Sequence, residues 1–274
     1  MMVSESTGVG NIERELDSGE RFGFGKNWKN FLSDVNEDRI REAEASLITM
    51  LGQGGVAGKT FLDMGCGSGL FSLAARRLGA SVFSFDYDPS SVWCADTLKK
   101  RYFDGDEDWT VERGSVLDID YLRSLGKFDI VYSWGVLHHT GKMWEALDNV
   151  DICVKETGKL YIALYNYQQF ASRYWLAIKR VYNKVKVLRP ALIAIHLIYP
   201  VVPSMIVKFF QGRKPPRGMT YWYDLVDWLG GYPFEVATPK QVFDEFNDRG
   251  YILCGIKTVG GKMGCNEFVF KKGA

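Results

Sequence analysis

Three glycines at alternate positions, Gly65, Gly67 and Gly69, follow an apolar stretch at residues 60–62. A loop built from glycines lets the backbone approach a nucleotide-like ligand closely, because no side chain stands in the way. A dinucleotide-binding fingerprint needs its third glycine at the sixth position, and that position is Leu70 here. The spacing therefore predicts a strand, a tight turn and a helix around a ligand of another kind.

Asp63 lies two residues before the first glycine, at the expected end of the strand. A carboxylate at this place can support a cationic amino-acid moiety. S-adenosylmethionine carries such a moiety together with two ribose hydroxyls, and it has no pyrophosphate. The residues therefore predict S-adenosylmethionine as the cofactor. Its expected contacts in the loop are Asp63, Gly65, Cys66, Gly67, Ser68 and Gly69.

The Asp-x-Gly-x-Gly-x-Gly sequence in this setting resembles motif I of the class I S-adenosylmethionine-dependent methyltransferases. A second stretch, Val-Leu-His-His at residues 136–139, resembles the fourth motif of small-molecule methyltransferases. These include the ubiquinone-biosynthesis O-methyltransferases, which often have a histidine at the position of His139. The resemblance covers about residues 61–166 and a portion near the C-terminus. It implies a Rossmann-like α/β fold with a seven-stranded mixed sheet, whose last strand is antiparallel and inserted beside the fifth.

A second carboxylate, Asp86, ends the apolar stretch at residues 81–85. It follows Asp63 by about 20 residues, the interval at which a second strand end delivers a carboxylate to a ribose diol. We expect Asp86 to bind the ribose hydroxyls and Tyr87 to pack on the adenine. Asp88 directly precedes a proline and suits the cap of the next helix better, which leaves Asp86 for the ribose.

The third and fourth strands, expected at residues 109–113 and 127–133, add further candidate contacts with the cofactor. Related methyltransferases often carry an aspartate after the third strand for the adenine amino group. Here Ser115 stands at that place beside Val116, with Asp118 three residues on. At the end of the fourth strand we expect Ser133 and Trp134 to reach the cofactor.

Two adjacent histidines, His138 and His139, follow the fourth strand. Histidine can take a proton near neutral pH. Methyl transfer from a sulfonium to an acidic hydroxyl needs one base and in-line positioning. His139 is the preferred candidate for the base and His138 the second, while the alternative for His139 is a structural hydrogen bond that holds the loop. The pair lacks a nearby carboxylate pattern, so we expect no metal site.

Polar residues at two other strand ends are candidate substrate contacts. Tyr165 and Asn166 follow the fifth strand, expected at residues 158–164, and Asn266 and Glu267 follow a glycine-rich hairpin at residues 259–265. Each pair can orient a polar acceptor. The alternative is that they satisfy the local backbone of a turn and a strand.

The chain before the first strand is interpreted as an extension, residues 1–36. Residues 1 to about 18 are expected to be disordered. The aromatic segment at residues 21–32 either packs on the domain surface or forms a lid over the cofactor, with Lys26 or Trp28 touching it. The five cysteines are scattered, and no apolar run precedes residue 20, which favours a reducing, cytoplasmic location.

The remaining chain divides into two parts. Residues 37–166 and 236–274 are expected to form the cofactor-binding domain, and residues 167–235 a helical insertion. Within the insertion, residues 190–207 are uncharged, contain internal prolines and have basic flanks. Three interpretations remain open: a substrate cap, a homodimer interface, or a peripheral membrane contact.

The sequence thus predicts a methyltransferase that acts on a small molecule, at a hydroxyl oxygen. A net charge of +1 gives no general reason to expect a nucleic-acid partner. The alternative of a nucleic-acid methyltransferase lacks the Asn/Asp-Pro-Pro-aromatic signature and a Pro-Cys nucleophile. A non-catalytic binding or scaffold protein, or an enzyme that uses the same cofactor for other chemistry, also remains open.

Overall fold

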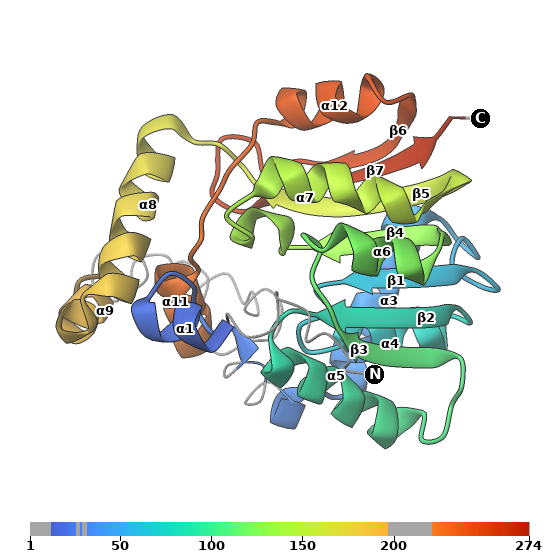
Figure 1. The fold of residues 1–274 in the computed structure, drawn as a ribbon, viewed down its shortest axis with the longest axis horizontal. Helices are drawn as coiled ribbons and strands as arrows, with labels where there is room; N and C mark the ends of the chain where they lie inside the picture. Colours follow the sequence, from blue (N-terminus) through green and yellow to red (C-terminus); the bar gives the residue numbers. More distant parts are fainter. Residues whose placement is uncertain (1–11, 26–27, 29–31, 197–220, 274) are drawn as a thin grey trace, which may run out of the picture.

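A computed structural model describes residues 12–25, 28, 32–196 and 221–273 of the chain (Figure 1). Its centre is a seven-stranded sheet with the order β3-β2-β1-β4-β5-β7-β6. The strands β1 to β5 are mutually parallel, and β7 runs antiparallel to both β5 and β6. The expected mixed seven-stranded sheet, with an antiparallel last strand beside the fifth, is confirmed.

The strands lie where the apolar stretches predict them. Their bounds are β1 Thr60–Met64, β2 Ser81–Asp86, β3 Trp109–Arg113, β4 Phe128–Trp134, β5 Val154–Tyr165, β6 Tyr251–Lys257 and β7 Cys265–Lys272. The fifth strand begins earlier than expected, because Val154 already pairs with Phe128 before an irregularity in the register. The polar Lys155 to Gly158 stretch hid this start from the hydrophobic pattern.

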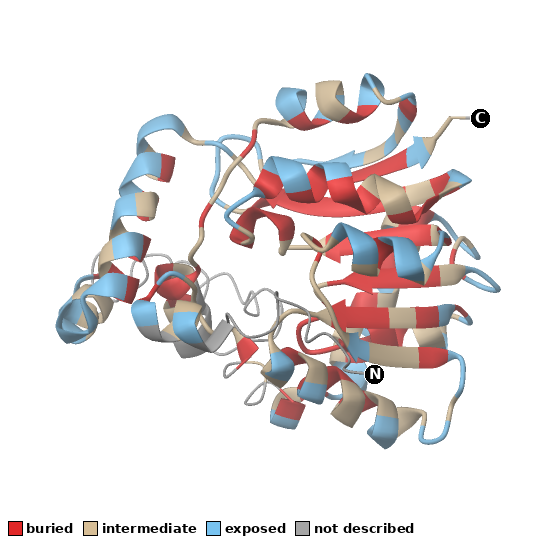
Figure 2. Ribbon diagram, viewed as in Figure 1, coloured by how far each residue is buried: buried red, intermediate tan, exposed pale blue. Residues whose placement is uncertain are grey.

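Two layers of helices cover the sheet. One face packs against α6 Ile119–Leu125, α7 Met143–Val150 and α12 Pro239–Asn247, and the other against α3 Glu37–Leu51, α4 Leu70–Arg77 and α5 Pro89–Tyr102. Burial of apolar side chains on both faces makes the strands read as nearly continuous hydrophobic runs (Figure 2). The carboxyl ends of the parallel strands therefore form one edge, at which a ligand crevice is expected.

Side-chain caps fix where several helices begin. Asp88 accepts a hydrogen bond from the backbone of Ser90 at the start of α5, with Pro89 at the first helical position. Asp118 does the same for α6, and Thr238 forms a capping box with Gln241 at the start of α12. The prediction that Asp88 is a helix cap is confirmed, and Asp118 is engaged in the same way.

The described part of the insertion consists of α8 Gln169–Lys184, the short turn η5 Lys186–Leu188, α9 Arg189–His196 and α11 Tyr221–Gly230. These helices lie beyond the carboxyl ends of the strands (Figure 1). They have a core of their own, whose buried members are Trp175, Tyr182, Leu225, Leu229 and Phe234. The face of α8 that carries Trp175 and Tyr182 is therefore turned toward α11 and the segment after it. Most of the segment at residues 190–207 lies outside the described residues.

The N-terminal extension is more ordered than the sequence indicates. Residues 12–18, expected to be disordered, form the helix α1 Ile12–Ser18. The backbone amides of Glu20 and Arg21 both donate to the carbonyl of Glu15, and the Arg21 guanidinium pairs with the Glu15 carboxylate. These contacts fold the chain back on itself, which a polar composition does not reveal.

Candidate functional site

The glycine loop lies at the carboxyl edge of the sheet, between β1 and α4. Its three glycines have positive φ angles, which favour glycine, and two of them are closely packed. A methyl group on Gly65 would lie 2.4 Å from a methyl of Val136, and one on Gly69 would lie 2.7 Å from the backbone of Ala95. The backbone of the loop is thus held against the β4 loop on one side and α5 on the other.

Asp63 is buried at the end of β1. Its carboxylate accepts a hydrogen bond of 2.5 Å from Ser72, which accepts one from Ser84, and Ser84 in turn accepts one from the indole of Trp109. Burial raises the pKa of Asp63 to about 7, the Ser72 hydroxyl opposes this rise, and the negative charge of Asp86 adds to it. A cation that approached Asp63 would therefore gain a strong partner.

Asp86 ends the neighbouring strand β2 and is tied to the loop. Its two carboxylate oxygens accept the backbone amides of Gly67 and Asp88, each at 2.9 Å. Burial raises the pKa of Asp86 to about 6 although both amides oppose the rise. A carboxylate offers about four lone-pair sites, so two remain for further donors such as hydroxyls.

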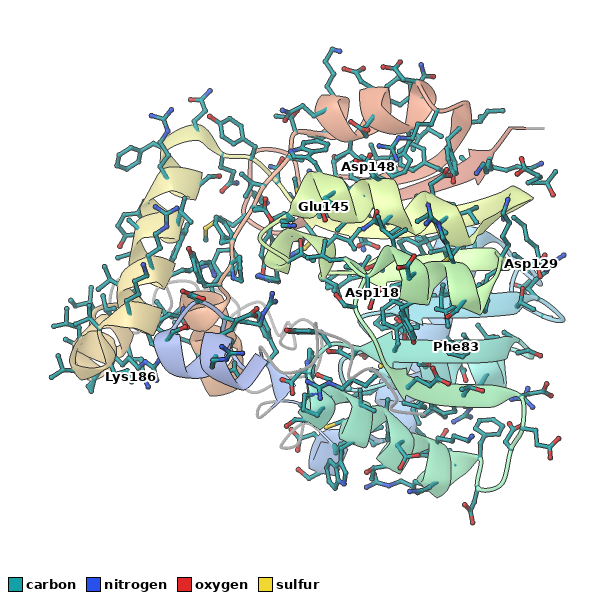
Figure 3. All side chains as sticks on the ribbon, viewed as in Figure 1. Phe83, Asp118, Asp129, Glu145, Asp148 and Lys186 are labelled. Carbon is teal, nitrogen blue, oxygen red and sulfur yellow. The ribbon has the colours of Figure 1, made fainter. Side chains whose placement is uncertain are left out.

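The residues expected at the adenine are brought to the same edge. Tyr87 follows Asp86, and the Arg21 guanidinium lies over its ring, 5.1 Å from the centroid. The Ser115 hydroxyl accepts the backbone amide of Leu117, and Val116 is buried in the core, where its carbonyl accepts the amide of Asn149. Figure 3 shows Asp118 at the sheet edge that faces α8, whereas Asp129 lies at the opposite edge.

The two candidates at the end of β4 differ in what they offer. The hydroxyl of Ser133 is fully buried and donates to the carbonyl of Met64 at 2.9 Å, so it joins β4 to β1 rather than pointing to a ligand. Trp134 is partly exposed and packs against the core on the α3 and α4 face. The side chain of Ser133 is thus engaged inside the sheet.

His139 is positioned by a backbone carbonyl. Its Nδ1 atom lies 2.6 Å from the carbonyl oxygen of Pro233. Because a carbonyl only accepts, Nδ1 carries the proton and Nε2 keeps the lone pair. Burial, together with the nearby charges of Lys179 and Arg21, lowers the pKa of His139 to about 3, although the hydrogen bond to the Pro233 carbonyl raises it. The ring is therefore neutral at physiological pH and has a free lone pair, but so low a pKa makes it a weaker base than an ordinary histidine.

His138 has different surroundings. It is fully buried, and its Nδ1 atom accepts the backbone amide of Tyr165 at 3.3 Å. Its ring lies against that of Tyr165, with centroids 3.9 Å apart. These contacts join the η3 turn Leu137–His139 to the end of β5, so the geometry gives His138 a structural role and does not support it as a base.

The segment after α1 crosses the site. Arg21 donates to the carbonyl of His139 at 2.9 Å, and the amide of Gly25 donates to the Asp88 carboxylate at 2.9 Å. A methyl group on Gly67 would lie 3.2 Å from the indole of Trp28, so this indole covers the middle of the glycine loop. The described part of the segment therefore lies over the ends of β1, β2 and β4. Lys26 lies outside the described residues.

A small aromatic pocket lies next to the histidine turn, between β5, α8 and α11. It is lined by Tyr165, Asn166, Gln168, Ser172, Trp175, Trp228, Phe234, Met263 and Gly264. The ring of Tyr165 is 5.4 Å from that of His139 and 5.4 Å from that of Phe234. Tyr165 therefore lines the pocket and also contacts the histidine.

The other expected substrate contacts are engaged in the hairpin. Asn166 donates to the carbonyls of Gly260 and Lys262 and accepts the amide of Asn266, while Asn266 accepts the backbone amide of Val259. Glu267 is buried elsewhere. It accepts the hydroxyl of Tyr161 at 2.5 Å and pairs with Lys257, on the side of the sheet that packs against α3. The structure does not bring Glu267 to the site, because β7 turns this side chain to the other face.

Several residues of the site could not be predicted from the sequence. Pro233 and Glu235 hold the histidine turn, since the Glu235 amide donates to the carbonyl of His138 and its carboxylate accepts the amide of Met143. Lys179 is fully buried, with its ammonium 4.8 Å from the ring centroid of Trp228 and 5.0 Å from that of Phe234. A lysine in a basic helix is normally expected to face solvent.

Two kinds of feature are absent from the described residues. No group of three or more histidine, cysteine, aspartate or glutamate side chains in this part of the chain is arranged to hold a metal ion. None of its helices is long and apolar enough to cross a bilayer.

Comparisons with known proteins agree with this geometry. Residues 35–198 match a family model described as a methyltransferase domain. The chain is 34% identical over 134 residues to the tRNA U34 carboxymethyltransferase of Methylococcus capsulatus, covering 47% of this chain and 36% of that protein. It is 30% identical over 117 residues to the ubiquinone biosynthesis O-methyltransferase of Brucella ovis, covering 40% of this chain and 42% of that protein. The matched region thus spans less than half the length of either relative.

Solved structures share the fold at low identity. The magnesium protoporphyrin IX methyltransferase (ChlM) of Synechocystis PCC 6803, with bound S-adenosylmethionine, matches with a TM-score of 0.54 at 11% identity. The match covers 99% of this chain and 100% of that one. An O-methyltransferase family protein of Burkholderia thailandensis matches with a TM-score of 0.56 at 13% identity, covering 97% of this chain and 68% of that one. At such identities the likeness concerns the arrangement of helices and strands.

Proposed function

The chain belongs to the methyltransferase domain family, and on this premise we propose that it transfers a methyl group from S-adenosylmethionine to a hydroxyl oxygen of a small acceptor. The observation that carries the proposal is the pair of buried carboxylates, Asp63 and Asp86, at the ends of adjacent strands on either side of the glycine loop. The proposal gives both carboxylates a function in a place where burial disfavours their charge.

The residues of the loop fit this cofactor. Asp63 has a raised pKa and no described cation bonded to it, so the methionine amine would supply the missing positive charge. Asp86 has free acceptor capacity for the two ribose hydroxyls. Tyr87, Ser115 and Val116 would bound the adenine. Trp28 would cover the cofactor from the N-terminal segment, which then acts as a lid.

His139 is the proposed base. The bound cofactor supplies a methyl group on a sulfonium, which is activated for transfer. The acceptor hydroxyl loses its proton to Nε2 of His139 as its oxygen receives the methyl group. The Pro233 carbonyl keeps the ring in the tautomer with the lone pair on Nε2, and it also stabilises the imidazolium that forms. Burial and the lid exclude water from this step.

The aromatic pocket is the proposed acceptor site. Its walls are mostly apolar and its polar members are uncharged, which suits the chemistry of a planar or lipophilic acceptor such as a phenol. Its cavity volume is only about 10 Å³, so the pocket would have to widen when such an acceptor binds. Tyr165 lines the pocket beside His139 and could orient a polar group, whereas the Asn166 amide is already bonded within the hairpin. In this proposal residues 167–235 form a substrate cap on the cofactor-binding domain.

A nucleic-acid acceptor is the second candidate. The observation in its favour is the similarity to tRNA U34 carboxymethyltransferases, which transfer a group other than methyl by name. The matched regions cover 36% and 31% of these proteins, which leaves most of their length without a counterpart here. An acceptor assay that includes unmodified tRNA beside phenols, sugars and quinone precursors separates the two candidates.

The first experiment is calorimetric titration of the protein with S-adenosylmethionine. We expect binding by the wild type and binding weakened by tenfold or more, roughly, in Asp86→Ala, because hydrogen bonds to a charged group are lost. Asp96→Ala is the matched control, since this carboxylate lies on the surface of α5 and pairs only with Lys100 among the described residues. Absence of binding by the folded wild type would overturn the proposal. Release of S-adenosylhomocysteine in the presence of an acceptor would then separate catalysis from binding alone.

A further inference from the structure

The insertion contains a long run without acidic residues. Between residues 157 and 223 the sequence has eleven lysines and arginines and no aspartate or glutamate, although the whole chain is nearly neutral. Acidic residues are thus concentrated in the rest of the chain. Such a separation of charge indicates an anionic partner for the insertion rather than a general property of the protein.

One side of α8 presents these cations to solvent. After Gln169 at its start, its exposed residues recur every three or four positions, as on one face of a helix: Phe170, Arg173, Tyr174, Ala177, Arg180 and Lys184. None of the three cations in this set forms an ion pair with a described residue. The opposite side of α8 is buried against α11. The cations are therefore available to a partner.

Apolar side chains are exposed at both ends of α8 and on α9. Phe170 at the start of α8 is 81% exposed, Val187 in η5 is 82% exposed, and Ile195 in α9 is 57% exposed. Leu188 is also exposed, and Lys186 lies between the helices at the end of the molecule away from the sheet (Figure 3). We call the exposed residues of α8, η5 and α9 together the α8–α9 face. Residues 197–220 are not part of the α8–α9 face.

We propose that the α8–α9 face binds an anionic phospholipid surface. Lysine and arginine near such a surface are attracted by its negative potential, and apolar side chains between them gain by entering the boundary between headgroups and acyl chains. A nucleic acid would interact favourably with the cations but would gain nothing from the exposed aliphatic side chains of Val187, Leu188 and Ile195. The combination of cations and aliphatic residues without acids favours the lipid surface.

The inference goes beyond the proposed methyl transfer and is independent of it. The two are nevertheless compatible, because the buried side of α8 carries Trp175, which lines the aromatic pocket. A protein docked by the outer side of α8 would hold that pocket close to the lipid surface. An acceptor that partitions into the membrane would then have a short path to the site.

The test is sedimentation of the full chain with vesicles of phosphatidylcholine, with and without phosphatidylglycerol. We expect binding to the anionic vesicles that weakens with salt and is much weaker on pure phosphatidylcholine. The double variant K184E/K186E should bind anionic vesicles about 30-fold more weakly or worse, since two favourable charges are removed and reversed. Lys127→Glu is the matched control, because Lys127 is also exposed but lies outside the insertion, and it should bind like the wild type.

A second pair of substitutions separates lipid from nucleic acid. Val187→Ser with Leu188→Ser keeps every charge and should also weaken vesicle binding, and both residues are exposed, so the fold is retained. Equal binding of this variant and the wild type would overturn the proposed insertion of apolar side chains. Binding to a tRNA mixture without binding to anionic vesicles would assign the face to nucleic acid and overturn the proposal. Absence of binding to anionic vesicles by the wild type would do the same.

Discussion

The Nδ1 atom of His139 lies 2.6 Å from the carbonyl oxygen of Pro233, 94 residues further along the chain. This contact joins the end of β4 to the segment that follows the insertion. Because the carbonyl only accepts, Nδ1 carries the proton, and Nε2 is left able to accept one. The histidine is thus prepared by a part of the chain that lies outside the glycine loop and the first five strands.

The first prediction concerns this histidine. His139→Ala should lower turnover by about a hundredfold or more, because general-base catalysis typically contributes a factor of this size. The affinity for S-adenosylmethionine should change little. Both quantities are measured by initial rates and calorimetric titration on the same preparation.

A conservative variant distinguishes the base from a structural residue. In His139→Gln the side-chain amide can still donate to the Pro233 carbonyl, but it cannot take up a proton. If His139 is the base, His139→Gln remains as slow as His139→Ala. Recovery of turnover in His139→Gln would show that the residue only holds the loop.

The second prediction concerns the pH dependence of cofactor binding. The pKa of Asp63 is raised to about 7 in the ligand-free protein, and a bound cation would lower it by favouring the carboxylate. Binding must then release a proton at low pH, so the affinity should increase as pH rises to about 7 and level off above it. Titration over this range, kept below a pH of about 8 at which the ligand amine itself loses its proton, measures the effect.

Asp63→Asn provides the comparison for that titration. The amide has no proton to release in this range, so its affinity should be lower at neutral pH and should not change with pH below it. A wild-type affinity that is independent of pH would contradict the role assigned to Asp63. An Asp63→Asn profile that still rises toward neutral pH would assign the titration to another group, of which Asp86 is the first to examine.

Much of the cofactor side of the site could be predicted from local sequence. The apolar stretches, the glycine loop and the carboxylates after β1 and β2 are all short-range patterns, and parallel strands bring their ends to one edge. The helix cap at Asp88 follows from the adjacent proline. In each case the residue and its partner are close in sequence, so pattern and structure agree.

The acceptor side depends on contacts between distant residues. The pairing of His139 with Pro233, and the placement of Lys179 among aromatic rings, join segments separated by the insertion. The position of Glu267 also could not be predicted from local sequence. The hairpin could be predicted, but not the register that turns this side chain toward Tyr161 and α3. A shift of one residue in a strand reverses the side that each residue faces.

The third prediction concerns stability at the edge of the sheet opposite the site (Figure 3). Asp129 accepts the amide and hydroxyl of Thr60 and pairs with Lys155, and despite partial burial these contacts lower its pKa to about 2. A lowered carboxyl pKa stabilises the folded state above the unfolded value of 3.8, and this stabilisation is lost as pH falls through about 2. Asp129→Asn should therefore lower the free energy of unfolding by about 1–2 kcal/mol at neutral pH, after allowance for solvent screening.

Urea unfolding at several pH values measures this effect. The difference between Asp129→Asn and the wild type should shrink as pH falls from about 4 to about 2. Glu156→Gln is the control, because the pair of Glu156 with Lys127 is exposed and should contribute less than about 1 kcal/mol. A constant difference at all pH values would indicate that Asp129→Asn acts through packing and not through charge.

The fourth prediction concerns the segment that crosses the site. Arg21 joins three parts of it, since its guanidinium pairs with Glu15, donates to the carbonyl of His139 and lies over the ring of Tyr87. Arg21→Gln should loosen this segment, so amide hydrogen exchange in residues 12–25 should become faster and the affinity for S-adenosylmethionine should fall about tenfold. Arg14→Gln, an exposed position on α1, is the control and should leave both unchanged. Faster exchange with unchanged affinity would mean that the segment packs on the domain without covering the cofactor, and the lid would have to be abandoned.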